Sequence, residues 1–99
     1  MLRFGIDLGG TKTEGVILDG GGRERFRERV ATNATSYATV LAGIERVYRR
    51  MCDDARGAPH TLGIGTPGAV SPRTGLLKNA NTTGLNGMPV AQDLRTRLG

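Results

Sequence analysis

Hydrophobic and polar residues alternate along much of the first third of the chain. Three such runs, at about Arg3–Leu8, Thr13–Leu18 and Arg23–Ala31, are separated by segments that contain glycine. A period of two is typical of a β-strand with one buried face, and short glycine-rich links are typical of tight turns. The pattern therefore predicts three strands in an antiparallel meander, with turns at Gly9–Lys12 and Asp19–Gly22.

After residue 35 the hydrophobic period changes to that of a helix. We expect this helix to run from about Ser36 to Asp54, with Ser36 as its N-cap, and Gly57 and Pro59 to end it. Because the apolar residues form one continuous stripe, we interpret them as core rather than as a ligand site. The stripe consists of Tyr37, Val40, Leu41, Ile44, Val47, Tyr48 and Met51.

The last third of the chain mixes one clear strand with many turn signals. A strand at Thr61–Gly65 comes after the helix, and a crossover helix favours a parallel pairing with the first strand. Residues 66–89 hold four turn signals around a short strand-like segment, Leu76–Lys78, and a last helix runs from Pro89 to Leu98. The order β-β-β-α-β-α predicts an incomplete α/β layer, because another parallel strand would normally cover the fourth one. We therefore expect a fragment.

The first turn contains the strongest candidate chemistry. Gly9 and Gly10 allow backbone N–H groups to approach an anion, and Thr11 and Lys12 add a hydroxyl and an ammonium group. Asp7, on the strand beside the turn, is placed to hold a hydrated Mg²⁺ ion through water. The combination predicts a clamp for nucleotide phosphates, and the alternative is a plain glycine hairpin.

Two other glycine motifs are excluded by the residues on their C-terminal side. Gly5 and Gly10 have the spacing of a P-loop, but a threonine stands where that motif requires lysine, and a strand comes next instead of a helix. Gly63, Gly65 and Gly68 spell a dinucleotide-binding fingerprint, yet Pro72 and Gly75 come too soon for a helix to open there.

Composition limits the other possibilities. Ninety-nine residues form at most one small domain, and with 37% hydrophobic but only 4% aromatic residues the core must be aliphatic. The single cysteine, Cys52, excludes an internal disulfide, and the single histidine, His60, argues against a four-ligand zinc site. No signal peptide or membrane-spanning run is evident. These features predict a cytoplasmic protein with no membrane partner.

The net charge of +5 comes mostly from arginine. Arg23, Arg25, Arg27 and Arg29 alternate with other residues, so that a strand would place all four on one face. A nucleic-acid surface would need interleaved aromatic residues or a reading helix, and neither is present. We therefore interpret the arginines as the solvated face of an edge strand, and expect no nucleic-acid partner.

A second candidate site lies in the turn-rich segment after Gly65. Its amide and hydroxyl side chains both donate and accept hydrogen bonds, as is needed to bind a sugar or another polyol. Asparagine in such segments also stabilises turns by bonding to its own backbone, and this alternative stays open. The residues are Asn79, Asn81, Thr82, Thr83 and Asn86.

Both candidate sites lie in motifs that resemble one known family. The run Ile6–Gly15 is similar to the phosphate-binding opening of ROK (repressor, open reading frame, kinase) sugar kinases, and Gly63–Pro72 with Gly75–Asn81 resembles their sugar-binding segment. The resemblance implies an α/β fold of the actin/hexokinase-like (ribonuclease H-like) type, with residues 1–99 as the N-terminal part of the first lobe. Residues 81–93 are most similar to the fructokinase/manno(fructo)kinase branch.

The resemblance also implies an activity, the ATP-dependent phosphorylation of a hexose. It places Gly9, Gly10, Thr11 and Lys12 at the ATP phosphates and Asp7 near Mg²⁺, and it assigns the hexose to Gly68, Ala69, Asn79 and Asn81. Gly84 departs from the pattern, which commonly has an aromatic residue there.

The same resemblance implies parts that lie outside this chain. They are the general-base aspartate expected beyond Gly99, the second lobe and a structural zinc site. We therefore expect the 99 residues alone to be inactive and the full-length protein to be a homodimer. Alternatives are a glucokinase, an N-acetylhexosamine kinase or a sugar-sensing regulator. The regulator is disfavoured because a strand that begins at Arg3 leaves no room for a helix-turn-helix before it.

Overall fold

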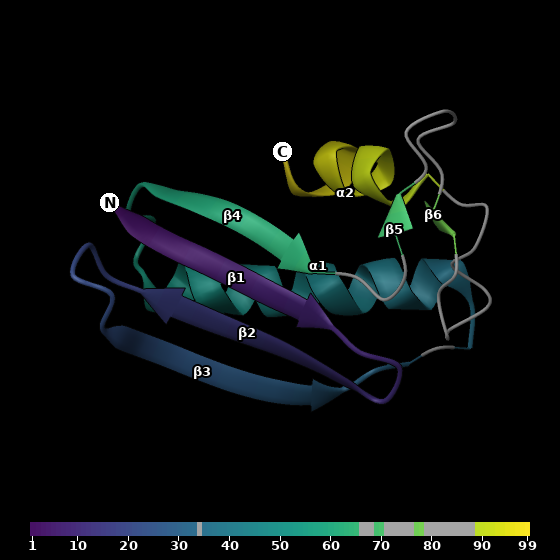
Figure 1. Ribbon diagram of the computed structural model, residues 1–99, viewed down its shortest axis with the longest axis horizontal. Helices are drawn as coiled ribbons and strands as arrows, with labels where there is room; N and C mark the ends of the chain where they lie inside the picture. The colour runs from purple at the N-terminus through teal and green to yellow at the C-terminus, as the bar shows by residue number, and fades with distance from the viewer. Residues whose placement is uncertain (34, 66–68, 71–76, 79–88) are drawn as a thin grey trace.

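Four strands form a single sheet, and one long helix packs across one of its faces (Figure 1). The computed structural model describes residues 1–33, 35–65, 69–70, 77–78 and 89–99. The elements are β1 (Leu2–Leu8), β2 (Lys12–Leu18), β3 (Glu24–Ala31), α1 (Tyr37–Asp54), β4 (His60–Gly65), β5 (Ala69–Val70), β6 (Leu77–Lys78) and α2 (Val90–Leu98).

The sheet has the order β3-β2-β1-β4. β1 pairs with β2 and β2 with β3 in antiparallel fashion, while β4 runs parallel to β1. The predicted meander and the predicted parallel crossover are therefore both confirmed. β3 is an edge strand of this sheet, as predicted. The predicted placement of all four arginines on one face is wrong, because Arg23 lies before β3 and the register of β2 with β3 shifts between Ile17 and Leu18, which leaves Arg25 beside Ile17 and Ala55.

The core lies between the sheet and α1. Gly15 on β2 allows the two layers to approach closely, because a Cβ atom there would lie 2.7 Å from Val47 Cγ1 and 2.8 Å from Met51 Sδ. No aromatic residue other than Phe4 is among the buried core residues of the described chain, in agreement with the predicted aliphatic core. The buried hydrophobic residues of the described chain are Phe4, Ile6, Leu8, Ile17, Val40, Leu41, Ile44, Val47, Met51 and Leu94.

The predicted limits of α1 are confirmed by its caps. The Ser36 side chain accepts a hydrogen bond from the Thr39 amide, and the Thr39 hydroxyl accepts one from the Ser36 amide, which closes a capping box. After Asp54 the chain leaves the helix through Arg56 and Gly57, whose φ angles of 54° and 72° are left-handed. Glycine at the second of these positions avoids the steric cost of a side chain.

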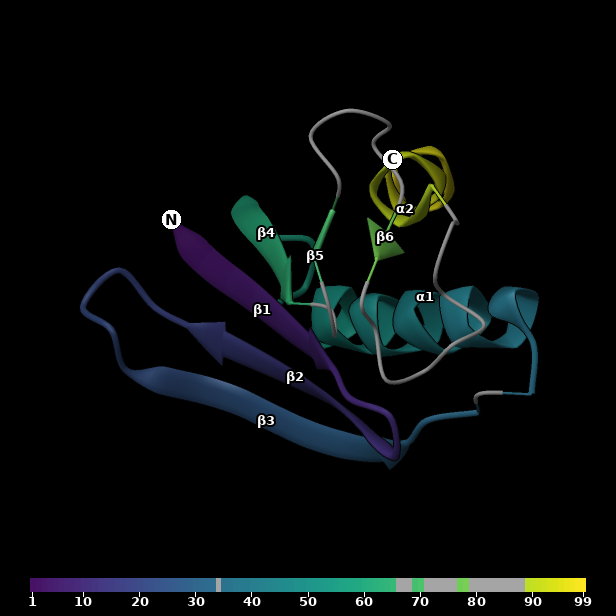
Figure 2. The ribbon, with the colours of Figure 1, turned by 45° about the vertical axis from the view of Figure 1, so that its right-hand side comes forward.

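The last helix, α2, is also present and lies beside α1 (Figure 2). A polar contact joins it to the start of α1. The Tyr37 hydroxyl donates a hydrogen bond to Asp93 Oδ2 at 2.6 Å. Burial, and then this carboxylate, raises the pKa of Tyr37 well above its ordinary value. Leu94 of α2 is buried in the core, so the helix is attached by both an apolar and a polar contact.

The segment after β4 differs in part from the prediction. β5 pairs with β6 in antiparallel fashion, with Ala69 opposite Lys78 and Val70 opposite Leu77. β6 was predicted as part of Leu76–Lys78, whereas β5 was not predicted, because two residues between turn signals are too short for a period to show.

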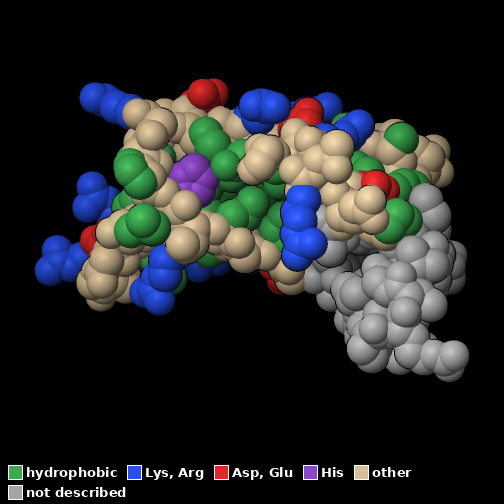
Figure 3. All heavy atoms as spheres, turned by 90° about the horizontal axis from the view of Figure 1, so that it is seen from above, with side chains coloured by type: hydrophobic (Ala, Val, Ile, Leu, Met, Phe, Trp, Pro, Cys, Tyr) green, Lys and Arg blue, Asp and Glu red, His purple; other side chains and the backbone are tan. Residues whose placement is uncertain are grey.

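Seen from above, over β4, the molecule shows hydrophobic side chains beside the single histidine, with Lys and Arg side chains around them (Figure 3). His60 stacks on Phe4 with ring centroids 3.8 Å apart, and its Nε2 lies 2.9 Å from the Tyr48 hydroxyl. His60 Nδ1 lies 2.9 Å from the carbonyl oxygen of Ala58, which can only accept, so Nδ1 carries a proton. Within the described ranges, no helix is long and apolar enough to cross a membrane.

Candidate functional site

The predicted phosphate clamp is the tip of the β1–β2 hairpin. β1 ends at Leu8 and β2 begins at Lys12, so Gly9, Gly10 and Thr11 form the turn. The Gly9 amide donates a 2.9 Å hydrogen bond to the carbonyl oxygen of Lys12, and a Cβ atom on Gly9 would lie 2.6 Å from that oxygen. Glycine is therefore required at position 9 by this close approach. Its amide donates within the turn, and the assignment of Gly9 to the ATP phosphates stays a prediction.

Asp7 and Lys12 lie on the same face of the sheet, the one opposite α1. Asp7 is paired with Glu14 across β1 and β2, and Lys12 lies two residues before Glu14 on β2. Paired residues share a face, as do residues two apart on one strand, so the three side chains lie on one side. Asp7 and Lys12 are exposed and make no ion pair with any residue that the structure describes. The structure thus brings the predicted carboxylate and ammonium group to the same end of the hairpin.

A shallow depression of about 290 Å³ adjoins Asp7 on this open face. Its floor is low because three glycines, Gly5, Gly63 and Gly65, stand in β1 and β4 where side chains would otherwise project. Gly65 lies directly beside Asp7, whose Oδ1 is 3.5 Å from the position that a Cβ atom on Gly65 would take. The open face is therefore accessible right up to the Asp7 carboxylate. The remaining lining residues are Ile6, Asp7, Glu14, Val16 and Arg27.

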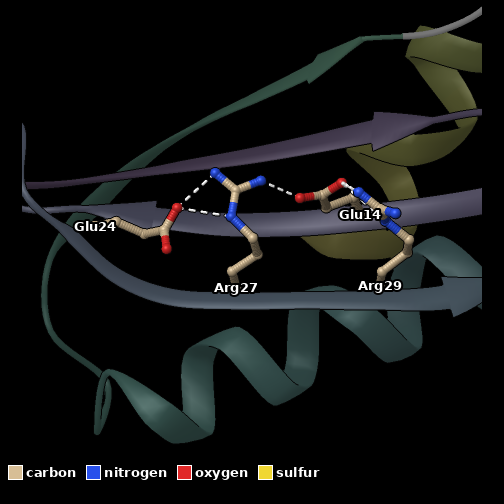
Figure 4. A network of polar contacts seen from close by, with 4 residues as sticks. All are labelled: Glu14, Glu24, Arg27 and Arg29. Carbon is tan, nitrogen blue, oxygen red and sulfur yellow. Dashed lines mark hydrogen bonds and ion pairs between the residues drawn. The ribbon is translucent and has the colours of Figure 1, made fainter.

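Glu14 is held by two arginines of the edge strand (Figure 4). Arg27 donates to Glu14 Oε1, and Arg29 Nη2 donates to Glu14 Oε2 at 3.0 Å, while Arg27 Nε also donates to Glu24 at 2.7 Å. These hydrogen bonds, from Arg27 first and then Arg29, lower the pKa of Glu14 below its ordinary value. This network was not predicted from the sequence. The feature of the sequence that could have indicated it is a glutamate on one predicted strand followed by alternating arginines on the next.

Two threonines that form hydrogen bonds next to the turn were also not predicted from the sequence. The Thr32 hydroxyl lies 2.9 Å from the Gly9 carbonyl oxygen and 2.8 Å from the Thr13 hydroxyl. Thr13 is 3% exposed and is the buried polar residue among those described. A threonine at a core-facing position of a strand was the available signal, because a buried hydroxyl needs a partner.

Of the predicted sugar site, the structure describes only Ala69. Gly68, Asn79, Asn81 and Gly84 lie outside the described residues, and Ala69 is the first residue of β5. The assignment of a hexose to Gly68, Ala69, Asn79 and Asn81 therefore stays a prediction. The exclusion of the dinucleotide fingerprint is supported, because Gly63 and Gly65 lie in β4 and the next described element is the strand β5, not a helix.

The residues at the hairpin tip are of the kinds that hold a magnesium–nucleotide complex. Within the described part of the chain, no group of three or more His, Cys, Asp or Glu side chains could hold a metal ion. Mg²⁺ commonly binds through one or two carboxylates together with water and phosphate oxygens. One exposed carboxylate, Asp7, beside an ammonium group and a turn whose glycine allows close approach fits that chemistry.

Comparison with known proteins defines the class of fold first and then the family. A ROK hexokinase from Thermus thermophilus superimposes with a TM-score of 0.84 at 28% identity, over 100% of this chain and 33% of the other. The fold is therefore of the actin/hexokinase-like type, as expected. Residues 3–99 match the ROK family, and the chain belongs to it.

Two further relatives describe the breadth of the family. An N-acetyl-D-glucosamine kinase from Pasteurella multocida (strain Pm70) is 37% identical over 98 residues, which are 99% of this chain and 32% of that protein. An inorganic polyphosphate/ATP-glucomannokinase from Arthrobacter sp. strain KM superimposes with a TM-score of 0.73 at 28% identity, over 99% of this chain and 41% of the other. The chain spans about a third of the length of the curated relatives that it matches.

Proposed function

We propose that this chain is the N-terminal part of the first lobe of an ATP-dependent hexose kinase, and that it supplies the phosphate-binding hairpin and part of the sugar site. The observation that carries the proposal is the placement of Asp7 and Lys12, exposed and unpaired within the described residues, on one face at the end of a hairpin with a glycine turn. Membership of the ROK family, and relatives named as sugar kinases, support it.

In this proposal each group at the hairpin has one task. The Lys12 ammonium group and the amides of the turn bind phosphate oxygens of ATP, and the Asp7 carboxylate holds Mg²⁺ through water. When bound, ATP supplies the phosphoryl group and Mg²⁺ offsets the charge of the phosphates. The chain's own contribution is positioning and charge, which dominate phosphoryl transfer.

The base that accepts the sugar hydroxyl proton is proposed to lie outside residues 1–99. Two carboxylates of the chain are already engaged, since Asp93 accepts a hydrogen bond from Tyr37 and Glu14 is held by Arg27 and Arg29. Asp7 is assigned to the cation. The 99 residues alone are therefore proposed to lack hexose kinase activity, whereas the full-length protein to which they belong, here called the parent protein, has it.

We further propose fructose as the preferred sugar, on the resemblance of residues 81–93 to the fructokinase branch. A second candidate, an N-acetylhexosamine, is favoured by the 37% identity with the Pasteurella N-acetyl-D-glucosamine kinase. An assay of the parent protein with ATP, Mg²⁺ and a panel of fructose, mannose, glucose and N-acetylglucosamine ranks them. Turnover with none of these sugars would overturn the kinase proposal in favour of a sugar-binding regulator.

The assignment of the hairpin is tested by charge-removing variants of the parent protein. Asp7→Asn and Lys12→Met are expected to lower kcat/KM for ATP by about a hundredfold or more, the usual cost of losing a group that stabilises transition-state charge. Matched controls are Asp53→Asn and Arg49→Met, which remove the same charges from exposed positions on α1. A melting temperature close to that of the wild type in all four variants ensures that the loss is not unfolding. Wild-type turnover in both hairpin variants would overturn the phosphate clamp.

A further inference from the structure

A short chain of hydrogen bonds runs from the core of the domain to the turn of the phosphate hairpin. The Thr13 hydroxyl on β2 lies 2.8 Å from the Thr32 hydroxyl, which comes just after β3, and Thr32 Oγ1 lies 2.9 Å from the carbonyl oxygen of Gly9. The Thr32 amide also donates a 2.9 Å hydrogen bond to the carbonyl oxygen of Thr11. One residue outside the hairpin therefore contacts two of its three turn residues.

The protons in this chain have a fixed direction. A carbonyl oxygen can only accept, so the single hydroxyl proton of Thr32 is donated to Gly9. Thr32 Oγ1 must then accept the proton of Thr13, which is 3% exposed. The direction is Thr13 to Thr32 to the Gly9 carbonyl. Each hydroxyl is satisfied in this way, and a methyl group in place of either would break the chain.

Fixing the two carbonyl groups also fixes two amides. In a trans peptide the C=O of one residue and the N–H of the next point in opposite directions, and the described chain contains no cis peptide bond. Because the carbonyls of Gly9 and Thr11 are directed toward Thr32, the amides of Gly10 and Lys12 are directed away from it. These two donors therefore point away from β3.

The turn itself leaves these amides available. In a closed four-residue turn, the carbonyl of the first residue accepts a hydrogen bond from the amide of the fourth. Among the bonds of the described residues, the Gly9 carbonyl accepts from the Thr32 hydroxyl, and none joins it to the Lys12 amide. Among the described residues, the Lys12 amide is therefore not used to close the turn, whose first carbonyl group is held by Thr32.

We propose that Thr32, held by Thr13, is a positioning residue that directs the backbone amides of Gly10 and Lys12 toward the phosphate groups of a bound nucleotide. The proposal rests on the proposed function, because it deepens the same site. It explains why a hydroxyl is buried at Thr13, on the face of β2 that otherwise packs against α1. Thr32 and Thr13 touch no nucleotide in this arrangement and act only through the turn.

The test replaces the hydroxyl without changing the size of the side chain. In the parent protein, Thr32→Val is expected to raise the KM for ATP and the dissociation constant of MgADP about tenfold, as expected for the loss of one hydrogen bond in a polar site. The KM for the sugar is expected to stay within about twofold of the wild type. Thr32→Ser, which keeps the hydroxyl, is expected to restore both nucleotide constants. Thr61→Val, an exposed threonine on β4, is the matched control.

The outcomes separate this proposal from the proposed function. Wild-type nucleotide constants in Thr32→Val would overturn the positioning role, and so would equal rises in both KM values with no recovery in Thr32→Ser. If the parent protein phosphorylates no sugar but binds MgADP, the kinase proposal fails, and the ratio of MgADP affinities for Thr32→Val and Thr32→Ser still decides the positioning role. Absence of MgADP binding to the wild type would overturn both.

Discussion

One face of the sheet is apolar and covered by α1, whereas the other carries Asp7, Glu14, Arg27 and Arg29 and no described helix covers it. Both faces are built from the same strands, because successive side chains point to opposite sides. Ile6 of β1 is 2% exposed on the covered face, and its neighbour Asp7 is exposed on the open one. The two faces therefore differ in what a substitution is expected to change.

The glycines show the same division. Gly15 faces α1 and is in contact distance of two core side chains, whereas Gly63 faces the open side and has no heavy atom within 4 Å of a Cβ position. Glycine serves close packing on one face and leaves space on the other. We infer that the covered face determines stability and the open face determines ligand access, and substitutions on each face test that division.

The largest expected effect on stability is that of a cavity on the covered face. Met51 has no exposed surface, so Met51→Ala in the parent protein is expected to lower the free energy of unfolding by about 2–5 kcal/mol. Val16→Ala, on the open face, is expected to cost about 0.5 kcal/mol or less. Urea unfolding followed by circular dichroism measures both. Equal losses would mean that the open face is buried in the parent protein, and would contradict the division.

A graded series of glycine substitutions is expected to give the next largest effect. Gly15→Ala forces the new methyl group against Val47 and Met51, and is expected to cost about 1–3 kcal/mol. A methyl group at Gly5 would lie 3.4 Å from Val16 Cγ1, which is an ordinary contact, and a methyl group at Gly63 would have no heavy atom within 4 Å. Gly63→Ala is expected to raise the free energy of unfolding by about 0.4–1 kcal/mol, by restricting the unfolded chain. Any other order of the free energies of unfolding of the three variants would show that the space around each glycine does not determine the effect of the substitution.

The covered face could be predicted from the sequence almost completely, and the open face only in part. The apolar stripe of α1 and the alternation in β1 and β2 report burial directly, because periodicity arises from geometry. Ser36 and Gly57 were predicted to limit α1 because capping has its own residue preferences. The parallel pairing of β4 could be predicted because a crossover helix precedes the strand.

The features of the open face that could not be predicted depend on strand register and on contacts between residues distant in the sequence. Glu14 pairs with Arg29 only because β2 and β3 align at that register, which no local pattern reports. Thr32 donates a hydrogen bond to Gly9, which lies 23 positions away in the sequence, so the residues around one do not indicate a contact with the other. The glycine turn could be predicted because it is a local sequence pattern. The hydrogen bonds from Thr32 that hold the turn could not be predicted, because they join residues far apart in the sequence.

The smallest expected effect is the pH dependence of the Glu14 network on the open face. Hydrogen bonds from Arg27 and Arg29 lower the pKa of Glu14 from its ordinary value of 4.5. A carboxylate whose pKa is lower in the folded state stabilises the fold above its unfolded pKa, and this contribution is lost as the pH falls through the folded pKa. Glu14→Gln is therefore expected to lower the melting temperature of the parent protein slightly at pH 7. The difference from the wild type should stay constant down to about pH 4.5 and shrink below it.

Exposure limits the size of this effect. The side chains of Arg27 and Arg29 are 52% and 64% exposed, so water and salt screen their interaction with Glu14. In about 1 M salt, where charges are screened over roughly 3 Å, the difference between wild type and Glu14→Gln is expected to narrow. Glu45→Gln on α1, which removes the same charge elsewhere, controls for the change in net charge. A Glu14→Gln difference that is independent of both pH and salt would mean that the Glu14 side chain stabilises the open face by packing, and the ion pairs of Figure 4 would contribute nothing measurable.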